Sequence, residues 1–334
     1  VGDVMDLQDE NRIVVKEGLR RMKNTKNYGL RALIRVNHLE EAELTGYHIG
    51  FVLGPCINAS GRLSTAKKAL NLLLCKDEKK AQELAEELKA LNDSRKEMTQ
   101  KGVEQAEKLV ETTELKEDRV LVIYLPDCHE SLAGIIAGRI RETYNKPVIV
   151  LTKGKDGVKG SGRSIETYHM FKELVKCKDL LSKFGGHPMA AGLSLPEENI
   201  EAFRRALNKK CTLTQEDMME KVLIDVPMPI SYVTLPLIRQ LSLLEPFGKG
   251  NNKPVFAEKN IKITQCRIFG KNKNVVKMKL YDKNGICMDG VWFGDGEAFV
   301  NEIQEKERWS IAYYPSINTY NGRESIEIIV QNYI

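Results

Sequence analysis

The spacing of hydrophobic and polar residues divides the chain into a helical first part, a middle part where strands alternate with helices, and a β-rich last part. In the first part, apolar residues recur at helical intervals in four segments: 9–23, 28–37, 40–53 and 65–74. In the first of these, Ile13, Leu19 and Met22 form an apolar stripe, and Asp9 is a candidate N-cap. The pattern predicts four amphipathic helices.

Residues 77–113 predict one long helix, because they are rich in Ala, Leu, Glu, Lys and Gln and contain no proline. At ~1.5 Å per residue, this helix extends over ~50 Å. Only Gly102 weakens the pattern, and the apolar stripe is narrow: Leu84, Leu88, Leu91 and Met98. A long helix with a narrow stripe is typical of a connector between domains.

Two continuous apolar runs, 120–125 and 147–152, predict buried strands in the middle part. Between them, residues 131–144 predict a helix with small residues along one side, which suits close packing on a sheet. The alternation continues with a turn at 154–157, strands at 158–164 and 189–195, and helices at 168–184 and 197–209. Such an order predicts an α/β domain.

From about residue 220 the pattern changes to short alternating segments: 222–226, 254–256, 261–268, 275–281, 286–292, 310–314 and 325–331. Turn residues separate them, including Asn284-Gly285 and Asn321-Gly322, and helices are predicted at 235–244 and 296–306. Several short strands with hairpin signals predict a small β-barrel or sandwich. The fold class is therefore α/β plus β.

Composition narrows the possible environments of the protein. The 334 residues are 42% hydrophobic, which suits two or three globular domains, and the net charge of +5 permits a nucleic-acid partner without requiring one. Seven cysteines without a CxxC pair indicate reduced thiols in a cytoplasm rather than disulfides or a zinc site. No apolar run is long enough to span a membrane. The chain begins at Val1 without an initiator methionine, so we expect it to be a piece of a longer protein.

The segment around Gly185, Gly186 and His187 is a candidate phosphate-binding loop. Adjacent glycines allow close approach of the backbone to a ligand, and the loop can present N–H groups and an imidazole to a phosphate. The alternative is a tight turn before a buried strand at 189–195, which these residues alone slightly favour.

Three further segments have residues suited to an anionic ligand. Residues 54–63 are dense in helix breakers and predict a loop that presents Asn58 and Arg62. His129 lies at a strand-to-helix junction, where ligands often bind in α/β folds. Arg163 follows small residues and can bind a phosphate bidentately, beside Ser161 and Ser164. Each segment alone is more often structural, but together they favour a phosphate-bearing ligand.

Several stretches resemble one known family, the bacterial RecJ single-strand-specific exonucleases of the DHH phosphoesterase superfamily. They occur in the expected order over nearly the whole chain: VGDVMDLQDENRIVVKEGLRRM, GPCINASGRL, SLAGIIAGRI, PVIVL, GSGRS, KFGGHPMAAGLSL and LEPFGKGNNKPVF. The resemblance implies four parts: a C-terminal remnant of the DHH catalytic domain at 1–76, a connecting helix at 77–116, a DHH-associated α/β domain at 117–215, and an OB-like nucleic-acid-binding domain at 216–334.

The resemblance also implies the chemistry, which is 5′-to-3′ hydrolysis of single-stranded DNA in repair and recombination with Mn²⁺ or Mg²⁺. Asp3 matches the family's last metal-ligand aspartate, although the residues alone favour a helix cap there. His187 and Arg163 would be catalytic, and the substrate-binding residues would be Asn58, Arg62, His129, Ser161, Ser164, Gly185 and Gly186. The implied partners are single-stranded DNA and a single-strand-binding protein or a helicase, with no membrane.

In the barrel, the resemblance implies a strand-binding groove with stacking aromatics. Its candidate residues are Lys271, Lys273, Lys277, Tyr281, Tyr313 and Tyr320. Barrel core for the tyrosines and a solvated face for the lysines remain open alternatives.

Departures from the family pattern limit what this chain can do. Cys56 stands where many relatives carry an arginine, which removes one phosphate contact, and Asp127-Cys128 precedes His129 where a tryptophan is common. The Asp-His-His and Asp-x-Asp motifs do not occur. We therefore predict that these 334 residues alone bind divalent metal poorly and do not cleave DNA.

Two other functions remain open. The first is a DHH-family phosphodiesterase for cyclic dinucleotides or short oligonucleotides, against which the long helix and the barrel argue. The second is a non-catalytic module that binds single strands or a partner protein. Affinity that rises with strand length and falls with salt would indicate a strand-binding channel.

Overall fold

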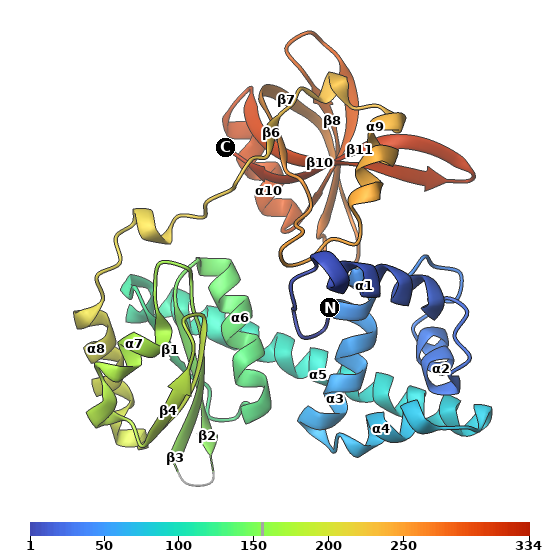
Figure 1. Ribbon diagram of the computed structural model, residues 1–334. Coiled ribbons are helices and arrows are strands. Elements are labelled where there is room, and N and C mark those ends of the chain that lie inside the picture. Colours follow the sequence, from blue (N-terminus) through green and yellow to red (C-terminus); the bar gives the residue numbers. More distant parts are fainter. Residues whose placement is uncertain (155–156) are drawn as a thin grey trace. The chain divides into compact units, whose positions relative to one another are not determined.

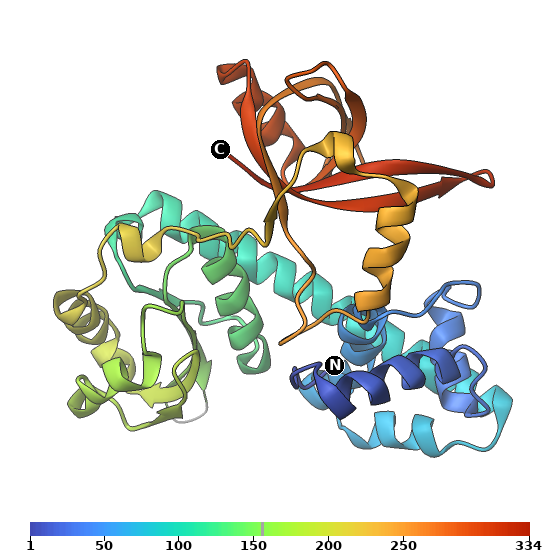
Figure 2. The same ribbon diagram turned by 45° about the horizontal axis from the view of Figure 1, so that its top comes forward.

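The computed structural model describes residues 1–154 and 157–334, which form two compact units (Figure 1; Figure 2). One unit contains residues 22–220, and the other combines residues 1–21 with residues 221–334. Residues 1–21 thus pack with the barrel, whereas the resemblance groups them with residues 22–76. Within the described residues, no helix combines the length and apolar character needed to cross a bilayer.

The first part of unit 22–220 is helical, and its helices pack against the long helix α5 (Glu78–Thr112). These helices are α2 (Tyr28–Val36), α3 (Gly54–Leu63) and α4 (Lys67–Leu74), and the π-helix η1 (His48–Leu53) contacts α3. The helix predicted at 40–53 begins only at about residue 46, so it is shorter than predicted.

Helix α3 replaces the loop predicted at 54–63, so that prediction was wrong. Pro55 lies at the second position of α3, directly after the π-helix η1, where the irregular turn replaces regular α-helical hydrogen bonding. The small residues Cys56, Ala59 and Ser60 are buried, which lets α3 approach α5 closely. Tertiary packing thus outweighs the weak helix propensity of this segment.

The predicted long helix is confirmed as α5, and Asp77 caps it by accepting a hydrogen bond from the backbone N–H of Lys80 at 2.7 Å. Its buried positions are mostly small: Ala81, Ala85, Leu88, Asn92, Thr99, Gly102, Ala106 and Val110. The first half of α5 contacts the helical part, and the second half contacts the α/β part. The helix therefore connects two parts of one unit.

The α/β part contains a mixed sheet with the strand order β1-β2-β3-β5-β4. Strands β1 (Leu121–Tyr124) and β2 (Val148–Gly154) are parallel, and the antiparallel strands are β3 (Gly157–Arg163), β5 (Ala190–Leu195) and β4 (Lys183–Gly186). The turn predicted at 154–157 includes residues 155–156, which lie outside the described residues.

Alternate residues of the central strands pack on opposite faces of this sheet. Helix α6 (Ala133–Tyr144), preceded by η3 (Glu130–Leu132), covers one face together with α5. The other face packs against α7 (Met170–Val175) and α8 (Ile200–Lys210). The helix predicted at 168–184 ends early, because residues 183–186 pair with β5 as an edge strand.

The barrel confirms the predicted OB-like domain. Its strands are β6 (Val226–Pro227), β7 (Phe256–Phe269), β8 (Val275–Tyr281), β9 (Cys287–Phe293), β10 (Trp309–Tyr320) and β11 (Arg323–Tyr333). The order β10-β11-β9-β8-β7-β6 is closed by pairing between β10 and β7. Two helices accompany the strands, α9 (Leu235–Leu241) and α10 (Gly296–Glu302), with short 3₁₀ turns after each.

Helix α1 (Asp9–Met22) precedes both parts in sequence and contains no buried residue. Of its apolar stripe, Ile13 is 66% accessible, whereas Leu19 and Met22 are partly buried. Asp9 has φ of +43° at the first helical position, so it does not have the extended backbone of an N-cap.

Candidate nucleic-acid interface

Three arginines from three different elements form a cluster in unit 22–220. Arg62 comes from the last turn of α3, Arg95 from the middle of α5, and Arg163 from the end of β3. Burial lowers the pKa of the Arg163 guanidinium, and the positive charge of Arg62 lowers it further. Burial also lowers the pKa of Arg95, and the charges of Arg62 and Arg139 act in the same direction. The guanidinium groups therefore repel one another.

Among the described residues, no carboxylate compensates this charge. Across residues 1–154 and 157–334, no Asp or Glu oxygen lies within 4.0 Å of the side-chain nitrogens of Arg62, Arg95 or Arg163. Half-buried arginines without carboxylate partners are suited to an external anion, and guanidinium groups match the oxygens of a phosphate. We refer to Arg62, Arg95 and Arg163 below as the arginine cluster.

Local contacts hold Arg163 in place. Its Nη1 donates to Ser161 Oγ at 3.2 Å and to the carbonyl of Gly162 at 2.7 Å. Opposite this side chain is Gly134 on α6, where an added Cβ would lie only 2.7 Å from Arg163 Nη2 and 2.8 Å from Ser161 Oγ. The absence of a side chain at residue 134 thus makes room for Arg163 and Ser161.

Ser131 links Arg62 to His129 at the start of the helical crossover. Arg62 Nη1 donates to the carbonyl of Ser131 at 2.8 Å. Nδ1 of His129 accepts from the backbone N–H of Ser131 at 3.3 Å and lies 2.8 Å from its hydroxyl. The strand-to-helix junction predicted as a ligand site therefore contacts the arginine cluster.

The Gly-Gly-His segment lies beside this cluster but has the form of a turn. Gly185 and Gly186 end the edge strand β4, and the N–H of His187 donates to the carbonyl of Ala190 at 2.7 Å. That backbone group is already paired within the turn. Arg163 pairs in register with Ala190, so the exposed His187 is in the turn that leads into the neighbouring strand.

Two other residues predicted to bind the ligand, Ser164 and Asn58, differ in their exposure to solvent. The Ser164 hydroxyl is buried and donates to the carbonyl of Tyr168, so it faces the domain interior and away from the surface. Asn58 is exposed on α3, about one helical turn before Arg62. We retain Asn58 in the candidate site and leave Ser164 as a structural residue.

The sequence motifs missed Arg95. It lies at helical spacing within the buried face of α5, which includes Leu88, Asn92, Thr99 and Gly102. A charged residue in the buried face of an otherwise solvated helix is a signal that could have identified it. Cys56 and Asn92 are buried at the same interface between α3 and α5. Cys56 Sγ accepts a hydrogen bond from Asn92 Nδ2 at 3.4 Å, and burial raises the pKa of the Cys56 thiol. Cys56 therefore adds no charge to the cluster.

The predicted metal ligand Asp3 is exposed near the start of the chain. Among the residues that the structure describes, no group of three or more His, Cys, Asp or Glu side chains could hold a metal ion. The described residues therefore do not form a metal site by themselves.

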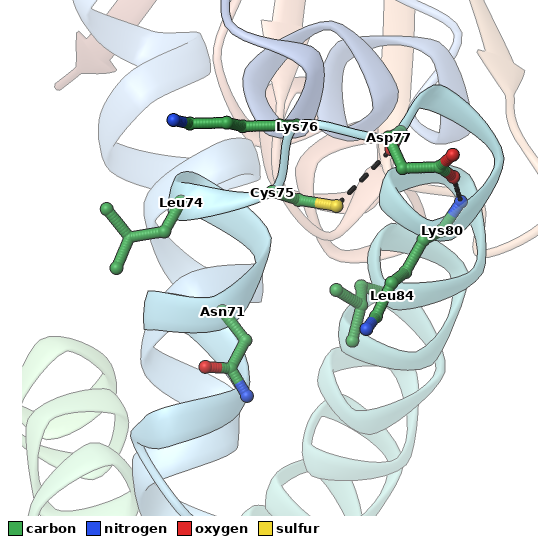
Figure 3. A pocket seen from close by; sticks show the side chains of 7 residues that line it. All are labelled: Asn71, Leu74, Cys75, Lys76, Asp77, Lys80 and Leu84. Atoms are coloured by element: carbon green, nitrogen blue, oxygen red, sulfur yellow. Dashed lines mark hydrogen bonds between the residues drawn. The ribbon is translucent and has the colours of Figure 1, made fainter.

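A cavity lies elsewhere, between the end of α4 and the start of α5 (Figure 3). It has a volume of about 620 Å³ and is lined by Asn71, Leu74, Cys75, Lys76, Asp77, Lys80 and Leu84. Cys75 Sγ donates to the carbonyl of Asp77 at 3.3 Å, as Figure 3 shows. The cavity contains no residue of the arginine cluster, so we do not place the site there.

In the barrel, three outward side chains form a row across neighbouring strands. Phe269 on β7 pairs with Val275 on β8, which pairs with Phe293 on β9. Phe269 is 46% exposed and Phe293 is 58% exposed. Arg267 and Lys277 pair with each other two positions along β7 and β8, on the same face. We refer to Phe269 and Phe293, with Val275 between them, as the aromatic row.

The barrel residues predicted from the sequence fall into two groups. Lys271 is exposed, Lys273 forms an ion pair with Glu297, and Lys277 lies 3.9 Å from Glu327. Among the tyrosines, Tyr281 is on the outward side of β8, Tyr313 is fully buried with its hydroxyl donating to the carbonyl of Met228, and Tyr320 is exposed. The core alternative therefore holds for Tyr313.

Family models match two parts of the chain, the DHHA1 domain over residues 117–213 and the RecJ OB domain over residues 224–332. The Single-stranded-DNA-specific exonuclease RecJ of Bacillus subtilis (strain 168) is 34% identical over 336 residues, which are 99% of this chain and 42% of the relative. The Escherichia coli (strain K12) protein of the same name is 34% identical over 348 residues, covering 99% of this chain and 59% of the relative.

Solved structures agree with these matches. The crystal structure of RecJ from Thermus thermophilus in complex with Mg²⁺ has a TM-score of 0.84 at 28% identity, covering 100% of this chain and 50% of that chain. The complex with Mn²⁺ has a TM-score of 0.82 and 28% identity, covering 100% of this chain and 48% of that chain. This chain spans about half the length of the curated relatives that it matches. Over that shared part, the chain belongs to the RecJ family of single-stranded-DNA-specific exonucleases.

Proposed function

We propose that this chain is the strand-binding part of a metal-dependent 5′-to-3′ single-stranded-DNA exonuclease that acts in DNA repair and recombination. One observation carries the proposal: the half-buried Arg95 and Arg163, together with Arg62, lack a carboxylate partner among the described residues. An anion is the ligand that relieves their mutual repulsion. The family membership makes a DNA phosphate the anion that we expect.

In this proposal, Arg62, Arg163 and Ser161 bind one phosphate at the start of α6. Arg163 acts as a catalytic residue by neutralising negative charge on the phosphate, and that charge is largest in the transition state. His187, in the turn next to Arg163 in the sheet, donates a ring N–H to a phosphate oxygen. The substrate-binding residues Asn58, His129, Gly185 and Gly186 position the adjoining nucleotide.

The barrel supplies a second contact with the strand. OB folds bind single strands with a basic groove and aromatic side chains, on which bases stack with ~1–3 kcal/mol each. The aromatic row supports this role because its rings are exposed on one sheet face, beside Arg267 and Lys277. Lys271, Lys273 and Tyr281 flank it as weaker contacts.

In this proposal, cleavage requires groups beyond those that the described residues provide. RecJ structures similar to it were solved with Mg²⁺ or Mn²⁺, and such ions activate water in phosphodiester hydrolysis. Asp3 is the one metal ligand that we assign here, and the described residues gather no set of three. We therefore propose that the isolated chain binds single-stranded DNA without cleaving it.

The cellular setting follows from the same proposal. We place the protein in the cytoplasm, where its seven free cysteines would remain reduced. A single-strand-binding protein or a helicase would supply the strand. We propose the domain parts as 1–76, 77–116, 117–215 and 216–334, with the connecting helix as the second.

The test is binding of labelled single-stranded DNA to the purified chain, measured by fluorescence anisotropy at several strand lengths and salt concentrations. We expect affinity to rise with strand length and fall with salt, and a 5′-phosphate to strengthen binding more than a 5′-hydroxyl. Tight, salt-insensitive binding of a dinucleotide would instead favour a small-substrate phosphodiesterase. Metal-dependent degradation of the strand would refute the inactivity of the isolated chain.

A further inference from the structure

The motif LEPFGKGNNKPVF contacts the first residues of the chain rather than forming a free loop. The N–H of Leu7 donates to the carbonyl of Lys249 at 2.7 Å. The Leu7 side chain is only 3% exposed and packs on Gly248, where an added Cβ would lie 2.6 Å from Leu7 Cδ1. A side chain at residue 248 would therefore push against the buried Leu7 side chain.

Polar contacts on both sides of Leu7 reinforce this attachment. The Asp6 carboxylate lies 2.9 Å from Lys249 Nζ, and Gln8 Nε2 donates to the carbonyl of Gly250 at 2.8 Å. Gly250 has φ of +76°, a conformation that favours glycine, and an added Cβ would lie 3.3 Å from Asp6 Cβ. Both glycines of the motif thus serve the contact with residues 6–8.

Arg12, in the first turn of α1, extends the contact to the other end of the motif. Its Nη2 donates to the carbonyls of Leu243 at 2.8 Å and of Glu245 at 2.9 Å. These carbonyls lie at the end of the 3₁₀ turn η8 (Ser242–Leu244), where backbone acceptors lack helical partners. One guanidinium therefore joins α1 to this helix end.

The loop is in turn anchored to the barrel. Asn251 Nδ2 donates to the carbonyls of Leu244 at 2.8 Å and Pro246 at 3.0 Å, which fixes the loop's own shape. The Phe247 ring meets the Tyr314 ring of β10 edge-on at 6.1 Å, and Lys253 Nζ lies 4.3 Å from the centre of the Tyr314 ring. These contacts therefore attach the loop to the barrel.

We propose that residues 243–250 form an intramolecular clasp that fixes residues 6–12 to the barrel, with Arg12 and Lys249 as positioning residues for the acidic loop of Asp3 and Asp6. The motif then serves to hold the chain's own first segment, and not to bind the DNA strand. Because the clasp joins that segment to the barrel, the barrel controls where Asp3 lies. Only the role of Asp3 rests on the proposed function, since the clasp contacts stand without it.

Hydrogen exchange of the Leu7 amide in the 334-residue chain tests the clasp, because this amide donates to Lys249 across it. We expect Arg12→Ala to lower the protection of Leu7 by ~10-fold, since two hydrogen bonds from a charged group are lost. Amides of β8 and β9 should keep their protection. Arg12→Lys should restore much of the protection, because an ammonium group can also donate to two carbonyls.

Arg20→Ala is the matched control, because Arg20 is on the same helix and its ion pair is with Glu17. It should leave Leu7 unchanged. Equal Leu7 protection in Arg12→Ala and wild type would overturn the clasp, as would a uniform loss of protection over the whole barrel. Strand affinity measured on the same samples separates the proposals: normal Leu7 protection in a chain that binds no strand would refute the strand-binding function and leave the clasp intact.

Discussion

The guanidinium of Arg163 occupies the space beside Gly134 that a side chain at residue 134 would need. An added Cβ would lie 2.7 Å from Arg163 Nη2, although the two residues are on different elements, the end of β3 and the first turn of α6. A missing side chain on a helix therefore determines where a phosphate-binding arginine can lie.

Gly134→Ala should weaken binding of 5′-phosphorylated single strands by ~10-fold, because the new methyl group displaces Arg163 from its contact with Ser161. Gly138→Ala is the matched control, since Gly138 is on the same helix with open space around it. Both changes favour the helix by ~0.5–1 kcal/mol, so fold stability alone cannot explain a difference. Anisotropy gives the affinity, and equal affinities of the two variants would contradict this role of Gly134.

Arg95→Gln should weaken strand binding yet leave the free energy of unfolding unchanged or slightly higher. The reason is that Arg95 is half-buried, is repelled by Arg62 and has no carboxylate partner in the described part of the chain. The slope of log affinity against log salt should fall by about one, as for the loss of one phosphate contact. Arg205→Gln, which removes an exposed arginine paired with Glu201, should change neither quantity. A large loss of stability in Arg95→Gln would mark the residue as structural.

Phe293→Ala should lower the affinity for a base-bearing strand by ~5- to 150-fold, the range expected when one stacking contact is lost. It should hardly change the affinity for an abasic strand of the same length, because that strand carries the charge without the bases. Arg267→Ala should weaken both strands equally. Tyr232→Ala serves as control, since Tyr232 is exposed on the 3₁₀ turn η7 (Ile230–Tyr232), outside the strands that carry the aromatic row. If Phe293→Ala weakens both strands to the same extent, stacking is excluded.

Asn208→Ala should destabilise unit 22–220 by roughly 2–4 kcal/mol, because its side chain satisfies three backbone groups at the start of β1. Its Oδ1 accepts from the N–H groups of Arg119 at 2.9 Å and Val120 at 3.0 Å, and its Nδ2 donates to the carbonyl of Val120 at 2.9 Å. Urea unfolding measures the loss. Asn208→Asp keeps the acceptor and loses the donor, so a smaller loss is expected, and identical losses in the two variants would argue against this network.

Much of the fold could be predicted from local patterns. The 35-residue helix α5 followed from an uninterrupted run of helix formers, and β8 was predicted with its observed bounds because alternation over seven residues is a strong local signal. The prediction failed where local preference and packing disagree. Residues 54–63 have weak helix propensity, but small side chains facing α5 make the helix favourable. Residues 183–186 were predicted in part as helix and are an edge strand, because β5 offers them hydrogen-bond partners.

Some residues of the candidate site could also be predicted from the sequence, and others could not. Arg62, His129, Ser161 and Arg163 were recognised from small residues and breakers close to them in sequence. Arg62 and His129 both contact Ser131, Arg163 contacts Ser161, and the charges of Arg62 and Arg163 repel each other. Arg95 was missed, and Ser164 was assigned to the ligand although its hydroxyl faces inward. The direction of a side chain depends on the strand's register, which one motif does not reveal.

Residue order alone predicted most element types, a three-part organisation and the family resemblance, because helix and strand periodicity and short motifs are local properties of a chain. Only the tertiary structure decided that three arginines from α3, α5 and β3 face one another, and that residues 6–12 attach to a loop more than 230 positions later. Charge repulsion and backbone pairing act over a few ångströms in space. Residues far apart in sequence enter that range only after the helices and strands have packed.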